Sequence, residues 1–348
     1  MRKLRLTAII IAAALAYSCD DDGTSGPASP ESQWETAFGT SPVPEAVADF
    51  WFCAPGDGWA TMGDKVLRYD GGEWREFHDF NTDPSIGDIY CEAVCALAPD
   101  DVWVGGSLKI GYPQTNLVHY DGEEWTPYLI PYEGLWPPIM RDLFFLAPDA
   151  GWLACSQGIY YYDGATWTLQ FENPARSLTM LSANDGWALA SVEGRADVIH
   201  WDGSSWTPQG IGGEYESGDR VQILEEINFR APDDGWVIGF RGPYFRGHVL
   251  RYDGTSWSEV ALPEGTPSLE AGAFDGADSG WLVSDEENVG VKAWRLHDGA
   301  VSAAPLPGNT WYVKAVATPA PGEAWAIAFP NPNLYSNDSY VLRYTGAE

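Results

Sequence analysis

One unit of sequence is repeated along most of this 348-residue chain. It is clearest between Phe50 and Trp74, where a short apolar run leads into a turn built on Ala-Pro and Asp-Gly, a Trp opens a second run, and a third run ends in Tyr-Asp-Gly. The Trp of the second run recurs every 35 to 49 residues, at Trp59, Trp103, Trp152, Trp187, Trp236, Trp281 and Trp325. Each unit carries four strand signals, so the sequence predicts seven four-stranded antiparallel sheets.

A second mark of the unit is the motif Asp-Gly-x-x-Trp, which follows the third run. It begins at Asp70, Asp121, Asp163, Asp202 and Asp253. Asp-Gly between two strands predicts a tight hairpin, because Gly accepts positive φ and the Asp side chain can accept hydrogen bonds from nearby backbone N–H groups. We interpret the Trp residues at the repeat positions as core residues that pack neighbouring sheets together.

Seven such units predict an all-β fold, a seven-bladed β-propeller of four-stranded antiparallel blades over residues 33–348. The seventh unit stops at Gly346 and has no fourth strand after it. The stretch from Ser32 to Phe38 lies before the first unit and is similar to the fourth strands of the others. We therefore expect the strand at Trp34 to complete the last blade and close the ring without an open sheet edge.

The chain is strongly acidic. It has 19 Lys and Arg against 50 Asp and Glu, a net charge of −31. Such a surface repels phosphate backbones, so no nucleic-acid partner is expected.

The first 18 residues have the pattern of an export signal: a basic start, an apolar run from Leu6 to Ala16, and then Ser18-Cys19. This pattern resembles a bacterial lipoprotein leader, with residues 1–18 as signal peptide, a lipid on Cys19 and residues 19–32 as a flexible tether. The resemblance implies a membrane anchor and a place in the bacterial cell envelope, facing the periplasm or the cell surface. An ordinary secretory signal is the alternative.

Four further cysteines follow the leader: Cys53, Cys91, Cys95 and Cys155. An even number in an oxidising compartment allows two disulfides in three possible pairings, of which Cys91 to Cys95 is the least favoured because both fall in one strand. There is no Cys-x-x-Cys, so neither redox chemistry nor a zinc site is indicated.

The repeats resemble the Asp-box or BNR repeats of bacterial secreted propellers, a group that includes sialidases and photosystem assembly factors. The resemblance rests on the Asp-Gly-x-x-Trp turns and covers about Trp34 to Gly346. Tectonin-type glycan-binding propellers have a similar rhythm of Trp and turns. The resemblance implies the architecture, while one propeller scaffold serves many functions.

No motif indicates catalysis, a cofactor or a metal site. Gly-x-Ser-x-Gly, His-Glu-x-x-His and the phosphate loop are all missing from the sequence. His119, His200 and His297 take repeat positions before the Asp-Gly turn, and we place His78 and His248 in loops. We expect a non-enzymatic binding protein, with a sialidase-like glycoside hydrolase as the alternative; a hydrolase requires a central pocket with paired carboxylates about 5–10 Å apart.

Long connections are predicted on one face of the propeller only, between the second and third strands and between blades. Several carry aromatic residues, among them Trp136 and Tyr244. Variable aromatic loops on one face of a rigid scaffold are typical of binding surfaces. We therefore expect a monomer that binds a protein or a glycan through this face.

A charged register gives a more specific hypothesis. Counting eleven residues back from each repeated Trp gives Ala48, Glu92, Arg141, Arg176, Glu225, Glu270 and Lys314. Six of these seven are charged, three of each sign. We expect them where each innermost strand begins, around the mouth of the central channel, with the three basic residues binding an acidic ligand and Glu92, Glu225 and Glu270 orienting them. A ring of purely structural ion pairs is the alternative.

Overall fold

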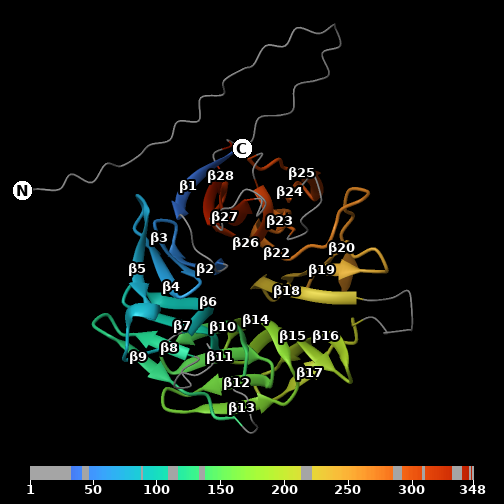
Figure 1. Cartoon of the computed structure of the whole chain (residues 1–348). Coiled ribbons are helices and arrows are strands. Elements are labelled where there is room, and N and C mark those ends of the chain that lie inside the picture. The colour runs from blue at the N-terminus through green and yellow to red at the C-terminus, as the bar shows by residue number, and fades with distance from the viewer. Residues whose placement is uncertain are drawn as a thin grey trace, which may run out of the picture. The chain divides into compact units, whose positions relative to one another are not determined.

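Seven four-stranded antiparallel sheets surround a central axis in the computed structural model (Figure 1). The structure describes residues 33–40, 47–87, 89–108, 117–132, 138–212, 222–284, 292–307, 310–330, 339–344 and 346. The predicted signal peptide and tether, and most of the predicted long connections, lie outside these residues. No helix in the described ranges has the length and apolar character needed to cross a membrane.

The first four blades follow one another along the chain, each with its innermost strand first. Blade 1 is β2 (Val47–Ala54), β3 (Asp57–Met62), β4 (Lys65–Tyr69) and β5 (Trp74–Asp79), followed by the 3-10 helix η1 (Phe80–Thr82). Blade 2 is β6 (Ile89–Ala98), β7 (Asp101–Leu108), β8 (Leu117–Tyr120) and β9 (Trp125–Tyr128). Blade 3 is β10 (Met140–Ala147), β11 (Ala150–Cys155), β12 (Gly158–Tyr162) and β13 (Trp167–Phe171). Blade 4 is β14 (Ala175–Ser182), β15 (Asp185–Val192), β16 (Arg195–Trp201) and β17 (Trp206–Pro208).

The last three blades complete the ring. Blade 5 is β18 (Gln222–Ala231), β19 (Asp234–Arg241), β20 (Arg246–Tyr252) and β21 (Trp257–Glu259). Blade 6 is β22 (Ala271–Gly276), β23 (Ser279–Val283), β24 (Ala293–His297) and β25 (Ala300–Ala303). Blade 7 is β26 (Thr310–Ala320), β27 (Glu323–Pro330), β28 (Ser339–Tyr344) and, from the start of the chain, β1 (Trp34–Thr40). The innermost strands contact one another around the axis, and the contact of β26 with β2 closes the circle.

The predicted closure by the N-terminal strand is confirmed. β1 pairs antiparallel with β28, with Trp34 opposite Tyr344 and Thr36 opposite Leu342 (Figure 1). The Trp34 ring is buried and packs edge-on against Trp281 of blade 6, with 4.8 Å between ring centroids. The first strand of the chain therefore covers the edge of the last blade and seals it against its neighbour.

The repeated Trp residues of the second strands form the core, as predicted. All seven are buried, with at most 4% of their surface exposed, and each lies in a cluster of side chains between adjacent blades. Trp187 stacks on Phe229 of the next blade, with centroids 4.5 Å apart and planes 7° from parallel. On the other side of Trp187 lies His200, whose ring nitrogen is 2.9 Å from Asp185. His119 stacks on Trp103 and bonds Asp101 in the same way, so these two histidines belong to the repeat.

The Asp-Gly turns have the predicted hairpin geometry. Asp163 Oδ1 accepts hydrogen bonds from the backbone N–H groups of Ala165 and Thr166, and the four other turn aspartates accept in the same pattern. Gly164 has a φ of +89°, which a side chain rarely tolerates. These turns therefore hold the third and fourth strands together.

Two expectations from the sequence need correction. His78 and His248 lie on strands β5 and β20 rather than in loops, because the third and fourth strands of these blades run further than the turn signals indicate. His248 is buried, and the Nε2 of His78 lies 3.2 Å from Asp83. Cys53, Cys91, Cys95 and Cys155 are free thiols, so neither of the two disulfides that the sequence allows is present among them.

Candidate functional site

The six charged residues of the predicted register line one cavity at the mouth of the central channel. Glu92, Arg141, Arg176, Glu225, Glu270 and Lys314 all contribute to its wall. The predicted juxtaposition of these side chains is therefore present in the structure. We refer to these six residues as the charged ring.

A β-bulge explains how the charged ring reaches the channel. In β10 the register passes from Met140 to Asp142, so Arg141 is an extra residue without a partner on β11. The same shift falls at Glu92, Arg176, Glu225 and Lys314 in their strands. Successive side chains of a regular strand point to opposite faces, and a bulge breaks this alternation. Both Arg141 and Asp142 can therefore line the cavity.

Two of the three basic residues of the charged ring are paired across blade boundaries. Arg176 of blade 4 forms an ion pair with Glu225 of blade 5. The Nζ atom of Lys314 in blade 7 lies 3.1 Å from an oxygen of Glu270, at the start of blade 6. Arg141 is exposed and makes neither a hydrogen bond nor an ion pair within the described ranges. Among the described residues, Arg141 is therefore the basic group of the ring whose guanidinium donors have no partner.

Below the charged ring lies a set of acidic residues that the sequence analysis missed. Asp49, Asp142 and Glu226 line the mouth cavity and also a second cavity further along the channel. We call these three residues the channel carboxylates. Their signal was present in the sequence, because each stands ten residues before a repeated Trp, one position after the charged register.

The channel carboxylates join neighbouring blades. Asp49 of blade 1 accepts a hydrogen bond from the backbone N–H of Val94 in blade 2, at 3.0 Å. Asp142 of blade 3 accepts from Leu178 in blade 4 at 2.8 Å, and Glu226 of blade 5 accepts from Gly272 in blade 6 at 2.9 Å. The hydroxyl of Ser177 and the thiol of Cys95 accept in the same manner between blades 4 and 5 and between blades 2 and 3. Asp275 of blade 6 accepts from Gly322 of blade 7 as well, so side chains on the innermost strands of blades 1 to 6 each connect their blade to the next.

Burial keeps the channel carboxylates easily protonated. Removal from water raises the pKa of Asp49 to about 7, an effect to which the nearby charge of Asp142 adds. Burial likewise raises the pKa of Asp142 to about 6 and that of Glu226 to about 8. Hydrogen bonds from backbone N–H groups act in the opposite direction, because they favour the charged form. Burial outweighs them at all three positions.

The two cavities are modest in size. The mouth cavity has a volume of about 250 Å³ and the inner one about 440 Å³, and both are lined by the innermost strands. A mouth cavity of this size can admit a side chain or a chain terminus, but not a folded surface.

Within the described ranges, no three His, Cys, Asp or Glu side chains are arranged to hold a metal ion.

Of the two aromatic residues predicted to bind ligand, only one is described by the structure. Trp136 lies outside the described residues. Tyr244, in the turn between β19 and β20, is 78% exposed and does not line the channel. The adjacent Phe245 is half exposed and packs edge-on against Phe240.

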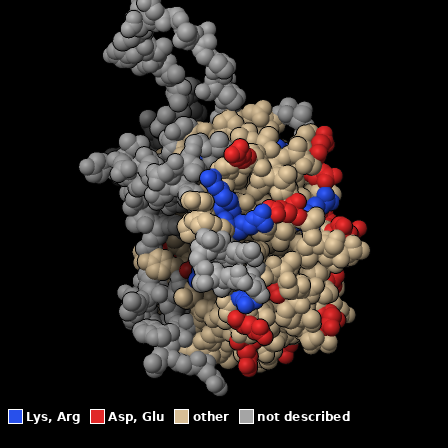
Figure 2. All heavy atoms as spheres, turned by 90° about the vertical axis from the view of Figure 1, so that its right-hand side faces the viewer, with Lys and Arg blue, Asp and Glu red and all other residues tan. Residues whose placement is uncertain are grey.

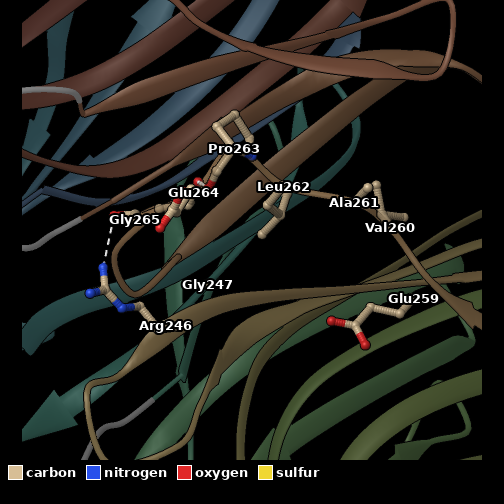
Figure 3. A pocket seen from close by; sticks show the side chains of 10 residues that line it. Arg246, Gly247, Glu259, Val260, Ala261, Leu262, Pro263, Glu264 and Gly265 are labelled. Atoms are coloured by element: carbon tan, nitrogen blue, oxygen red, sulfur yellow. Dashed lines mark hydrogen bonds between the residues drawn. The ribbon is translucent and has the colours of Figure 1, made fainter.

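A separate cavity of about 690 Å³ lies at the outer part of blade 5, between β20 and the chain that leads to blade 6. Figure 3 shows Arg246 at one end, where it donates to the Gly265 carbonyl at 3.1 Å, and Glu259 at the other, with Leu262 between them. Glu259 is also 2.5 Å from Arg241. On this side of the molecule basic and acidic side chains alternate (Figure 2). The surface therefore has no uniform charge here, and both arginines of this region are held by partners, Arg246 by Gly265 and Arg241 by Glu259.

Comparison with known proteins supports the fold and leaves the function open. No protein-family model matches the chain, and no curated protein matches it. Among solved structures, YCF48 bound to D1 peptide aligns with 18% identity and a TM-score of 0.65, over 93% of this chain and 100% of that one. YCF48 from Cyanidioschyzon merolae aligns with 16% identity and a TM-score of 0.62, over 89% and 98%.

An enzyme shares the same architecture. A streptogramin B lyase structure aligns with 14% identity and a TM-score of 0.61, over 89% of this chain and 96% of that one. At such identities the similarity defines the class of fold, a seven-bladed propeller, and nothing finer.

Proposed function

We propose that this chain is a non-enzymatic binding protein of the bacterial cell envelope, anchored through Cys19, whose channel mouth binds an acidic group of a protein segment. The observation that carries the proposal is the state of Arg141. It is the exposed guanidinium of the charged ring that has no partner within the described residues, whereas Arg176 and Lys314 are held by Glu225 and Glu270. A guanidinium of this kind is suited to a carboxylate, which it can bind through two parallel hydrogen bonds.

The dimensions of the site favour a peptide over a folded partner. A cavity of about 250 Å³ accommodates an Asp or Glu side chain or a C-terminal carboxylate. The YCF48 structure with a D1 peptide gives a precedent for peptide binding on this architecture. We therefore favour an extended, acidic peptide segment as the ligand, ahead of a glycan.

The experiment is a screen of the purified full chain against an array of 12-residue peptides with and without acidic residues, beside an array of neutral and acidic glycans. We expect acidic peptides to bind, and Arg141→Ala to lower their affinity at least about tenfold, the size of one lost charged hydrogen bond. Arg75→Ala is the matched control, because Arg75 is an exposed arginine on the outer strand β5 and pairs there with Asp70. Equal binding by Arg141→Ala and the wild type, or binding to glycans alone, contradicts the proposal.

One observation favours the alternative function, a glycoside hydrolase. The raised pKa values of the channel carboxylates are of the kind that general acids have in glycosidases. However, both oxygens of Asp49 and of Asp142 accept backbone N–H groups, which fixes these carboxylates as links between strands. Incubation with fluorogenic sialosides and other aryl glycosides separates the two functions, and turnover that is lost in Glu226→Gln would favour the hydrolase.

A further inference from the structure

We propose that the channel carboxylates couple anion binding at Arg141 to the uptake of protons, so that the mouth of the channel is a proton-linked anion site. This inference rests on the proposed function, because it takes the channel mouth as the binding site. It adds the condition under which the site binds. Two features of the structure carry it: the cavity that Arg141 shares with the channel carboxylates and the balance of charge around that cavity.

The charge balance of the mouth opposes an anion when every group is ionised. The charged ring contributes Glu92 from β6, Arg141 from β10, Arg176 from β14, Glu225 from β18, Glu270 ahead of β22 and Lys314 from β26. The channel carboxylates add Asp49 from β2, Asp142 from β10 and Glu226 from β18. The cavity wall then holds six acidic and three basic groups, a net charge of −3. Neutralising the three channel carboxylates brings the net charge of the wall to zero, with Arg141 still unpartnered by any described residue.

The geometry gives the channel carboxylates a reason to take up protons. They lie where the two cavities meet, on innermost strands of different blades, and together they place three acidic groups on one wall. They are close enough to oppose each other's ionisation, since the charges of Asp49 and Asp142 both raise the pKa of Glu226 after burial itself. Cys95 of β6 is buried and burial raises its pKa, so it stays a neutral thiol.

An anion at Arg141 strengthens this tendency. Arg141 and Asp142 are consecutive residues of one bulge and line the same cavity, so a negative ligand on Arg141 adds a like charge beside Asp142. A like charge nearby raises the pKa of a carboxyl group further. The complex therefore holds more protons than the free protein between about pH 5.5 and 8. By linkage, the affinity for the anion must rise as the pH falls through this range.

The experiment is a titration of the full chain with a fluorescein-labelled tetra-glutamate peptide at pH 5.5, 6.5, 7.5 and 8.5, with a tetra-glutamine peptide as the uncharged probe. We expect the affinity for tetra-glutamate to rise as the pH is lowered. The increase should reach up to about tenfold for each pH unit and for each proton that binding takes up. Calorimetry in buffers of different ionisation enthalpy measures that proton uptake directly on the wild-type protein.

Glu226→Gln is the informative variant, because glutamine imitates the protonated acid and its carbonyl oxygen can still accept from Gly272. We expect this variant to bind more tightly than the wild type at pH 8.5 and to show a flatter pH dependence. Glu264→Gln removes the same charge at the separate cavity of blade 5 and serves as the matched control. In Glu264→Gln the affinity for tetra-glutamate should keep the pH dependence of the wild type. This result would show that the effect of Glu226→Gln does not come from the change in net charge alone.

The outcomes separate this inference from the proposed function. Tetra-glutamate binding that is equal at all four pH values, with no proton uptake by calorimetry, overturns the linkage and leaves the anion site. The linkage is also overturned if the affinity for tetra-glutamate has the same pH dependence in Glu226→Gln as in Glu264→Gln. No tetra-glutamate binding at any pH overturns the anion site, and the linkage falls with it.

Discussion

Substitution of Trp34 by alanine tests how the ring is closed. Trp34 is 4% exposed and belongs to the core cluster between blades 6 and 7, together with Trp281 and Leu342. Its ring lies 4.8 Å from Trp281 and 5.6 Å from Tyr344, in edge-on contacts. The substitution leaves the backbone pairing of β1 possible but empties the space that the indole fills.

The expected loss follows from these contacts. Replacing a buried Trp by Ala in a core costs about 3–5 kcal/mol. Each aromatic contact adds about 0.5–1.5 kcal/mol to what burial alone provides, and Trp34 makes two of them. We therefore expect the free energy of unfolding to fall by about 4–5 kcal/mol, near the upper end of that range.

Urea denaturation of the full chain, followed by Trp fluorescence and far-UV circular dichroism, measures the change. Trp34→Phe keeps an aromatic ring and should lose distinctly less stability, and Leu169→Ala on the outer strand β13, where the side chain is 42% exposed, should change little. A loss below about 1 kcal/mol for Trp34→Ala, together with rapid hydrogen exchange at Thr36, would refute the closure argument.

Three further predictions concern the turns, the charged ring and the channel carboxylates. Gly164→Val should lower stability by about 1–3 kcal/mol without changing peptide binding. Gly164 has a φ of +89°, and a Cβ atom at this position would lie 2.9 Å from the Cβ of Asp149. Weaker peptide binding at an unchanged melting temperature would contradict this prediction. Arg176→Ala breaks an ion pair whose arginine is 43% exposed, so the folded protein should lose less than about 1 kcal/mol of stability in thermal unfolding. A larger loss of stability would mean that the charged ring is mainly structural. The pKa values of the channel carboxylates are raised to about 6, 7 and 8 in the folded protein, so the fold binds extra protons and its stability should rise as the pH falls from 8 towards 4. Hydrogen bonds lower the pKa of every turn aspartate. At Asp202 and Asp253, whose pKa falls to about 2, a hydroxyl donor has the largest effect and backbone N–H groups add to it, while at the other three the backbone N–H groups have the largest effect. The stability that these aspartates contribute is therefore lost as the pH falls from about 4 to 2. The free energy of unfolding, measured with urea from pH 8 to pH 2, should have its maximum near pH 4. A steady decline in stability from pH 8 downwards would contradict the raised pKa values of the channel carboxylates.

The repeat made most of the fold predictable. The spacing of residues such as Trp59 and Trp103 reports a unit of four strands, and every unit buries the same position against its neighbour. The unpaired Trp34 signal at one end and the missing strand at the other implied the closure. The tight turns were also predictable from the sequence, because the backbone conformation of the turn itself favours Asp-Gly.

The site was only partly predictable, for a physical reason. Regular alternation along a strand predicts which side chains share a face, and it would send Arg141 and Asp142 to opposite faces. The bulge that places both in the channel depends on how β10 pairs with β11, and this pairing leaves no signal in β10 alone. The raised pKa values depend on burial at the meeting of several blades, which also cannot be deduced from one strand. His248 was misplaced because the extent of β20 depends on its partner β19.

The most direct test of the central claim is a crystal structure of the full chain with an acidic peptide selected from the array. We expect a carboxylate of the peptide at the channel mouth, with an oxygen about 3 Å from a guanidinium nitrogen of Arg141. Asp142, the next residue in the same bulge, should line the occupied cavity. A peptide seated instead in the outer cavity of blade 5, against Arg246 and Leu262, would contradict the account.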